Sequence, residues 1–134
     1  MVMPLTNCFV EIYMSPFKGQ SGVRRIVNAA GYSLAGLRAA FIGEAAFRQL
    51  LLLNAILIPI SFFLSVSPVE RALMVAVCLL SLIVELFNSA IEAAIDRISL
   101  ERHPLSKNAK DMGSAAQMVG MTMIAAVWGI ILFG

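Results

Sequence analysis

Residues 72–96 read ALMVAVCLLSLIVELFNSAIEAAID, and this stretch decides the fold. It is long and apolar enough to cross a hydrocarbon core of about 30 Å as an α-helix. At 100° per residue, Glu85, Asn88, Glu92 and Asp96 fall on one side of that helix, while Leu, Ile, Val and Phe cover the opposite side. The pattern therefore predicts a membrane-spanning helix with one acidic face.

Glu85 is the residue of this face that most needs an explanation. If the span begins near Ala72 on the outer side, Glu85 lies roughly 20 Å in, at ~1.5 Å per residue, and so within about 10 Å of the cytoplasmic boundary. A carboxylate at that depth costs at least about 2.5–3.5 kcal/mol. We expect Glu85 to face the protein interior, a partner or a metal. Asp96, near the helix end, could instead pair with Arg97 or Arg102.

The rest of the chain has the composition of a membrane protein. Hydrophobic residues make up 60% of the 134 residues and charged residues 13%, against about 25% charged in soluble domains. Spans are predicted at 45–66, 70–97 and 112–133; Pro59 inside the first is tolerated in membrane helices. The predicted fold is an all-α membrane protein with three transmembrane helices.

The N-terminal part shows two further patterns. Residues 1–20 have no period and are predicted to be a flexible tail. Residues 21–41, with Ser21 as a potential cap, predict an amphipathic helix whose cationic side suits an anionic membrane surface. The alternative is an ordinary surface helix of the kind found in soluble proteins. Residues 21–134 are expected to form a single domain, with this helix lying at the interface.

The distribution of Lys and Arg predicts the orientation. Only Arg71 lies between the first two spans, whereas basic residues precede the first span and separate the second from the third: Lys18, Arg24, Arg25, Arg38 and Arg48, then Arg97, Arg102, Lys107 and Lys110. The N-terminus is expected in the cytoplasm and the C-terminus outside. Trp128 and Phe133 suit the outer interface. A net charge of +2 is too small to indicate a nucleic-acid partner.

Each span brings polar groups to the cytoplasmic boundary. Glu44 begins the first span, with Arg48 one turn on, and Lys110 with Asp111 opens the third. Each pair could also be a simple helix-end feature. Carboxylates, an amide and a cation together fit Mg²⁺-assisted phosphoryl transfer, although there is no GxxxxGK[ST] loop. The residues alone indicate a metal-using or proton-using site in the membrane.

Five strings carry a resemblance to a known family. They are AAGYS (29–33), GLRAA (36–40), EAAFRQ (44–49), ELFNSAIE (85–92) and NAKDMGSA (108–115). Over about residues 23–133 the chain resembles the small prokaryotic integral-membrane diacylglycerol kinases. Gly43, Leu50 and Arg102 depart from the family pattern, where Asn, Glu and Tyr are expected.

The resemblance implies an ATP- and Mg²⁺-dependent kinase of the bacterial inner membrane that converts diacylglycerol to phosphatidic acid. It implies a homotrimer with active sites between protomers, near the cytoplasmic surface, and a periplasmic C-terminus. In that family, Glu85 matches the general base, Asn88 matches a residue that bears on activity, and Glu44 and Glu92 match the carboxylates that hold the metal with the nucleotide.

The resemblance also implies contacts with ATP and with the lipid. ATP would contact Arg25, Tyr32, Glu44, Glu92, Glu101, Arg102, His103, Lys110 and Asp111. The lipid would contact Arg25, Ala29, Ala30, Gly31, Tyr32, Ser33, Leu34, Arg38, Ala39, Ala40, Phe41, Ala46, Phe47, Arg48, Gln49, Leu50, Glu85 and Ser114.

Three alternatives remain open. An undecaprenol kinase keeps the chemistry and changes the lipid. A non-enzymatic proton or cation pathway would use Glu85, Glu92 and Asp96, and it requires a polar stripe through the whole span, which residues 72–80 lack. A structural membrane subunit would leave the buried Glu85 unexplained.

Overall fold

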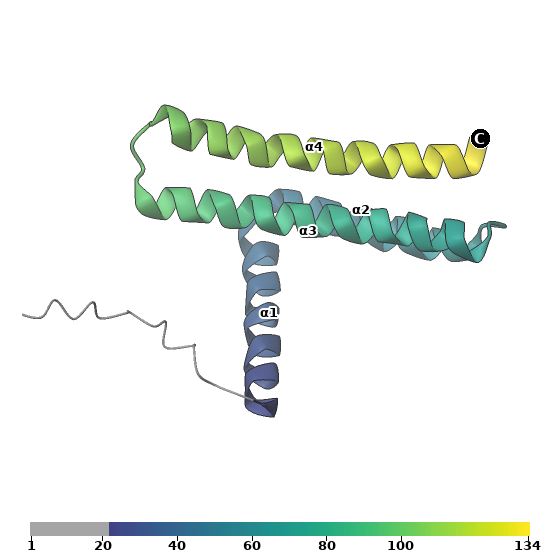
Figure 1. Cartoon of the computed structure of the whole chain (residues 1–134), viewed down its shortest axis with the longest axis horizontal. Coiled ribbons are helices and arrows are strands. Elements are labelled where there is room, and N and C mark those ends of the chain that lie inside the picture. Colours follow the sequence, from purple (N-terminus) through teal and green to yellow (C-terminus); the bar gives the residue numbers. More distant parts are fainter. Residues whose placement is uncertain (1–21) are drawn as a thin grey trace, which may run out of the picture. The chain divides into compact units, whose positions relative to one another are not determined.

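The computed structural model describes residues 22–134, and this part of the chain is folded into four α-helices (Figure 1). They are α1 (Val23–Gly43), α2 (Ala45–Phe63), α3 (Pro68–Ile98) and α4 (Pro104–Phe133). The last three are long and apolar enough to cross a membrane, which confirms the predicted all-α membrane fold. The predicted tail 1–20 and the Ser21 cap lie outside the described residues.

The described residues divide into two compact units, residues 22–35 and residues 36–134. The first contains the beginning of α1, where Ser33 Oγ donates to Ala29 O at 2.9 Å. A helix is present close to where residues 21–41 predict one, but its place at the membrane interface stays a prediction. The second unit contains the three spans, with Glu44, Glu85 and Glu92.

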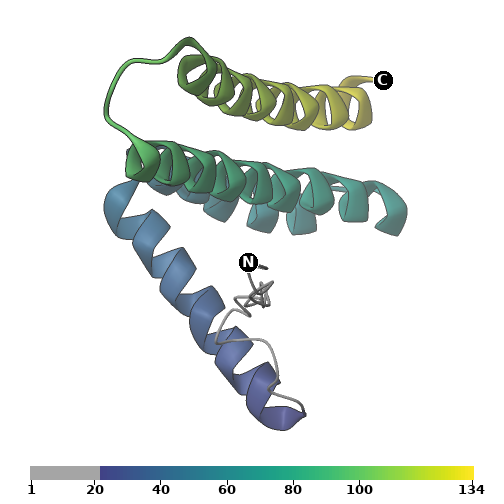
Figure 2. The same ribbon diagram turned by 60° about the vertical axis from the view of Figure 1, so that its left-hand side comes forward.

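In the second unit α3 packs against both α2 and α4. Asn54 of α2 donates to Cys78 O, and Trp128 of α4 donates to Met74 O. Towards the other end of α3, Lys110 at the start of α4 pairs with Asp96. Neighbouring helices are therefore antiparallel, and α4 runs beside α3 in both ribbon views (Figures 1 and 2).

Local capping sets the ends of α3 and α4. Ser67 and Glu70 form a capping box at the start of α3: Ser67 Oγ accepts from Glu70 N at 3.3 Å, and Glu70 Oε2 accepts from Ser67 N at 2.7 Å. α4 begins at Pro104, eight residues before the predicted span start at 112. The reason is that His103 Nδ1 accepts from Leu105 N, and Pro is well suited to the first helical turn.

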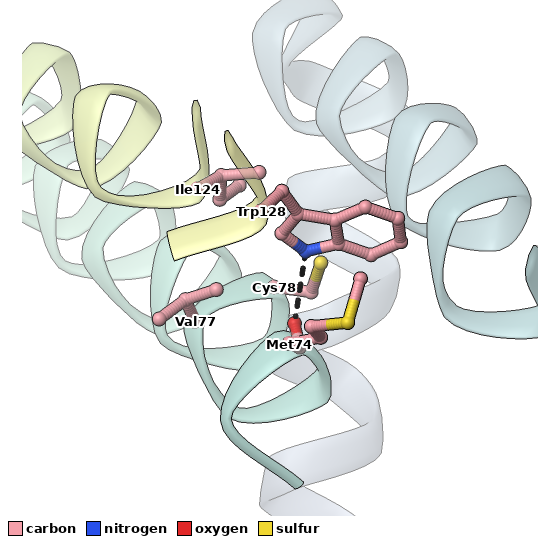
Figure 3. Close-up of a cluster of buried hydrophobic side chains, with 5 residues drawn as sticks. All are labelled: Met74, Val77, Cys78, Ile124 and Trp128. Atoms are coloured by element: carbon pink, nitrogen blue, oxygen red, sulfur yellow. Dashed lines mark hydrogen bonds between the residues drawn. The ribbon is translucent and has the colours of Figure 1, made fainter. Parts of the chain in front are cut away.

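A cluster of buried apolar side chains joins α3 and α4 in the half of α3 nearer its N-terminus (Figure 3). It consists of Met74, Val77, Cys78, Ile124 and Trp128. The Trp128 indole is 8% exposed, and its Nε1 donates to Met74 O at 3.3 Å. Trp128 packs on α3 because its helix face turns toward that helix and the buried indole N–H finds a backbone acceptor there; its level relative to the outer membrane interface stays a prediction.

Arg71 ties α3 to the last turn of α2. Its Nε donates to Ser61 O at 2.9 Å, and its Nη2 donates to Leu64 O at 3.0 Å. The guanidinium also lies over the Phe62 ring, 5.7 Å from the centroid. Arg71 thereby satisfies carbonyl groups that the end of α2 leaves without intrahelical partners.

We expect Arg71→Leu to lower the free energy of unfolding by about 1–3 kcal/mol, because two charge-assisted hydrogen bonds are lost and the carbonyls are left unsatisfied. Unfolding by sodium dodecyl sulfate in mixed micelles measures this loss. Arg24→Leu, which removes an exposed cation of α1, is the matched control and should change the midpoint little. Equal midpoints for the two variants would contradict this role of Arg71.

Candidate active site

Glu85 is buried in the second unit although it lies on a membrane-spanning helix. Its side chain is 3% exposed, so it faces other helices and not lipid. It is close enough to Glu44 and Glu92 to feel the charge of each. The structure therefore places Glu85 within electrostatic range of two carboxylates, Glu44 from the other span and Glu92 from its own, and these three residues are called the acidic group.

Glu44 lies near Glu85 because the chain is not helical at this residue, which separates α1 from α2. The residue has extended backbone angles (φ −111°, ψ 113°) between α1 and α2, and its side chain makes no cap hydrogen bond. Arg48, which could have paired with it, instead donates to Phe41 O at 2.8 Å and Ile42 O at 3.1 Å, at the end of α1. The Glu44 carboxylate is thus left for the acidic group.

Asn88 lies one turn beyond Glu85, where α4 comes closest to it. Its Oδ1 is buried and has no hydrogen-bond partner among the described residues. The backbone of Gly113 on α4 is so near that a Cβ at Gly113 would collide with Asn88 Oδ1. The Asn88 amide can therefore occupy this position only because residue 113 has no side chain. Its oxygen remains available to accept a hydrogen bond.

Among the described residues the acidic group forms no ion pair with a Lys or Arg, although Lys110 lies near enough to Glu92 to feel its charge. Among residues 22–134 the ion pairs are Lys107–Asp111 and Lys110–Asp96 (2.6 Å), so no Lys or Arg of that range pairs with Glu44, Glu85 or Glu92. Asp96 forms its ion pair with Lys110 and not with Arg97 or Arg102.

Magnesium fits these carboxylates only under one condition. Within the described part of the chain, no three His, Cys, Asp or Glu side chains are grouped so that they could hold a metal by themselves. Mg²⁺ commonly takes one or two carboxylates and completes its shell with phosphate oxygens and water. Unpaired carboxylates that repel one another suit such an ion when a nucleotide supplies the other ligands.

A cavity of about 580 Å³ lies at the connection between α3 and α4. Its walls include Glu101, Arg102, His103 and Lys110, four of the residues predicted to contact ATP. Asp111 is not among the lining residues and pairs with Lys107. The volume lies within the range of small-molecule sites, and both signs of charge line the cavity.

The remaining predicted site residues divide by position. Arg25, Tyr32 and residues 29–34 belong to the first compact unit, so their part in a site stays a prediction. In the second unit Ala40, Phe47 and Leu50 are buried, whereas the others are exposed: Arg38, Ala39, Phe41, Ala46, Arg48, Gln49 and Ser114. Their contact with a lipid also stays a prediction.

Sequence reasoning missed four contributors: one glycine and three residues of the cavity wall. Gly113 was noticed only as part of a string, although a glycine beside an apolar run signals close helix contact. The cavity also uses Ser99, Ser106 and Asn108. The His103-Pro104 pair was the signal for a helix start there.

The sequence is similar to those of known proteins. The sequence model described as prokaryotic diacylglycerol kinase matches residues 31–132. A protein of Pseudomonas aeruginosa named diacylglycerol kinase is 72% identical over 120 residues, covering 90% of this chain and 98% of its own.

More distant relatives carry the same name. The diacylglycerol kinases of Escherichia coli K12 and Haemophilus influenzae are 47% and 46% identical over 113 residues, 84% of this chain, and these matches cover 93% and 96% of the relatives. The family match and these identities confirm the resemblance seen in the five sequence strings. The chain belongs to the prokaryotic diacylglycerol kinase family.

Proposed function

We propose that this protein transfers the γ-phosphoryl group of ATP to the free hydroxyl of diacylglycerol, which yields phosphatidic acid and ADP. The observation that carries the proposal is Glu85: a carboxylate that is 3% exposed on a membrane-spanning helix, without a protein cation, beside Glu44 and Glu92. The names of the relatives supply the substrate class.

Glu85 serves as the general base in this proposal. It accepts the proton of the lipid hydroxyl as the bond between that oxygen and the γ-phosphorus forms and the bond from phosphorus to the bridging oxygen of ADP breaks. Its burial keeps water, a competing nucleophile, away from the transferred group. Before the reaction, Asn88 Oδ1, which has no partner in the described chain, can accept the single hydrogen of the hydroxyl and so orient it; the hydrogen then passes to Glu85 as the new bond forms.

Glu44 and Glu92 would hold Mg²⁺ together with the nucleotide. The ion supplies charge stabilisation at the phosphates when it is bound. The two residues suit this task because neither has a Lys or Arg partner among residues 22–134.

The cavity beside the α3–α4 connection is the place we propose for the rest of ATP. Lys110, which is partly exposed, and Arg102 offer cations toward phosphates, while Glu101 and His103 offer hydrogen-bonding groups. The Lys110–Asp96 pair joins α4 to α3 at this cavity and thereby fixes its wall.

The position of Lys and Arg supports an inner-membrane protein with a cytoplasmic N-terminus and a periplasmic C-terminus. We also propose a homotrimer. Ala90, Ala93 and Ala94 are exposed on α3 and allow a second helix to approach closely. Residues of a neighbouring protomer could then complete the nucleotide site.

A direct comparison of the two lipids shows whether diacylglycerol or undecaprenol is the substrate. Purified protein in phospholipid vesicles, supplied with radiolabelled ATP, should label diacylglycerol, and chelation of Mg²⁺ should abolish labelling. The two lipids are offered at equal mole fraction. Preferential labelling of undecaprenol would change the substrate, and labelling of neither lipid would contradict the proposed function.

We expect Glu85→Gln to lower kcat by about 10²–10⁴-fold, the range of general acid–base catalysis, and to leave ATP binding nearly unchanged. A fluorescent ATP analogue and the labelling assay measure the two quantities separately. Glu70→Gln is the matched control: it makes the same change on the same helix, and Gln also suits a capping box. If both variants retain wild-type kcat, Glu85 is not the base.

Gly113→Ala should lower kcat about tenfold to a hundredfold, since the added methyl displaces the Asn88 amide and misplacement by about 1 Å can cost that much. Gly129→Ala is the control, because a Cβ there meets nothing within 4 Å. The fluorescence of the single tryptophan, Trp128, reports whether α4 still packs on α3.

A double variant separates the two explanations for such a loss. If Gly113 acts through Asn88, Gly113→Ala should cost little further activity in an Asn88→Ala background. Additive losses would mean that Gly113 serves helix packing alone.

A further inference from the structure

The ion pair of Lys110 and Asp96 lies where the cavity meets the acidic group. Lys110 Nζ and Asp96 Oδ1 are 2.6 Å apart, although the two residues are 14 positions apart in the chain and belong to different helices. Both residues line the cavity. Lys110 is also near enough to Glu92 to feel its charge. The ammonium group therefore lies between the place proposed for ATP and a carboxylate proposed to hold Mg²⁺.

Lys110 differs in its surroundings from the other cations of the cavity wall. Lys107 pairs with Asp111 of its own helix, and its side chain is 75% exposed, against 36% for Lys110. Arg102 is exposed and forms no ion pair within residues 22–134. Of these three cations, Lys110 is the one that an acidic residue of another helix holds in place.

Two carboxylates of α3 are within reach of this one ammonium group. Glu92 and Asp96 are four residues apart, so they share a helix face with about 5–6 Å between their Cβ atoms. The ammonium bonds to Asp96, and Glu92 has no ion pair in the described part of the chain. A Glu92 paired with lysine would bind Mg²⁺ less well, because the two cations repel each other. The Asp96 carboxylate thus leaves Glu92 available to a metal ion.

The pair also prepares Lys110 for a phosphate ligand. A lysine side chain is flexible, and fixing it in advance removes part of the entropy cost of binding. An ammonium group has three hydrogens, and Asp96 accepts one of them. The other hydrogens remain for phosphate oxygens, which the partial exposure of both side chains allows.

We propose that Asp96 is a positioning residue for the nucleotide. It holds the Lys110 ammonium between the cavity and Glu92, where the ammonium contacts the phosphates of ATP, and it keeps Lys110 from pairing with Glu92. This inference rests on the proposed function, which takes ATP as the ligand of the cavity. Phosphates that run from the cavity to Mg²⁺ at Glu92 pass Lys110, which offsets the charge that develops on the departing ADP.

Binding of a fluorescent ATP analogue to the full chain, with Mg²⁺ present, tests the proposal. Asp96→Asn keeps the side-chain shape and removes the charge, so it should raise Kd about threefold to tenfold, since a half-exposed ion pair is worth little more than that. Asp96→Glu should keep Kd near the wild-type value. Arg97→Gln, the control, removes an exposed charge next to Asp96 but outside the cavity wall and should leave Kd unchanged.

The outcomes of this experiment separate the two proposals. A wild-type protein that does not bind the analogue would contradict the proposed function. Wild-type binding with an unchanged Kd in Asp96→Asn would overturn the role of Asp96 and leave the proposed function standing.

A charge swap distinguishes positioning from a purely structural tie between α3 and α4. The double variant Asp96→Lys/Lys110→Asp restores an ion pair of opposite polarity, so the midpoint of unfolding by sodium dodecyl sulfate should return to the wild-type value. Binding of the analogue should stay weak, because the cation now extends from α3, four residues from Glu92, and can pair with it. Recovery of binding together with stability would overturn the proposal and leave the pair a structural role only.

Discussion

A carboxylate can stay inside a membrane protein only where the protein surrounds it, and the arrangement of the three spans follows from that requirement at Glu85. α3 has 31 residues and α4 has 30, whereas about 20 suffice to cross the hydrocarbon core. The residues beyond this length lie at the α3–α4 connection, because the opposite end of α4, up to Phe133, is apolar. Glu92, Asp96 and Lys110 thereby extend into the polar boundary, and Glu85 marks the transition between the two environments.

The contact between α3 and α4 repeats about every two helical turns. Asn88, Ser81 and Met74 of α3 are spaced by seven, and they meet Gly113, Gly120 and Trp128 of α4, which are spaced by seven and eight. Such a step keeps one face of each helix turned toward the other. The two glycines allow close approach where polar side chains occupy the interface, and the tryptophan fills the interface where the α3 side chains are apolar. The α3–α4 interface therefore contributes to both the candidate site and the hydrophobic cluster.

The spans and the acidic face of α3 could be predicted from the sequence because both depend on local patterns: apolar length and a 100° period. What could not be predicted depends on which neighbour a side chain meets. Arg48 bonds to carbonyls at the end of α1 and not to Glu44, although the i,i+4 spacing favoured a pair. Asn54 stands alone in an apolar run, and only the packing of α2 on α3 brings its amide to the Cys78 carbonyl. Glu44 lies near Glu85 because the backbone is not helical at this residue, and no residue type at this position predicts that break.

The distribution of polarity along α3 bears on the class of function. A proton or cation pathway requires polar groups from one boundary to the other. Here the polar groups run from Asp96 past Glu85 to Ser81, and then the buried side chains of Met74, Val77, Cys78, Ile124 and Trp128 close the interior. The buried indole N–H of Trp128 is bonded to a backbone carbonyl and is not free to carry a proton onward. A site that opens at the α3–α4 connection and is closed by apolar side chains toward the other end of the bundle suits a reaction between a soluble nucleotide and a membrane lipid.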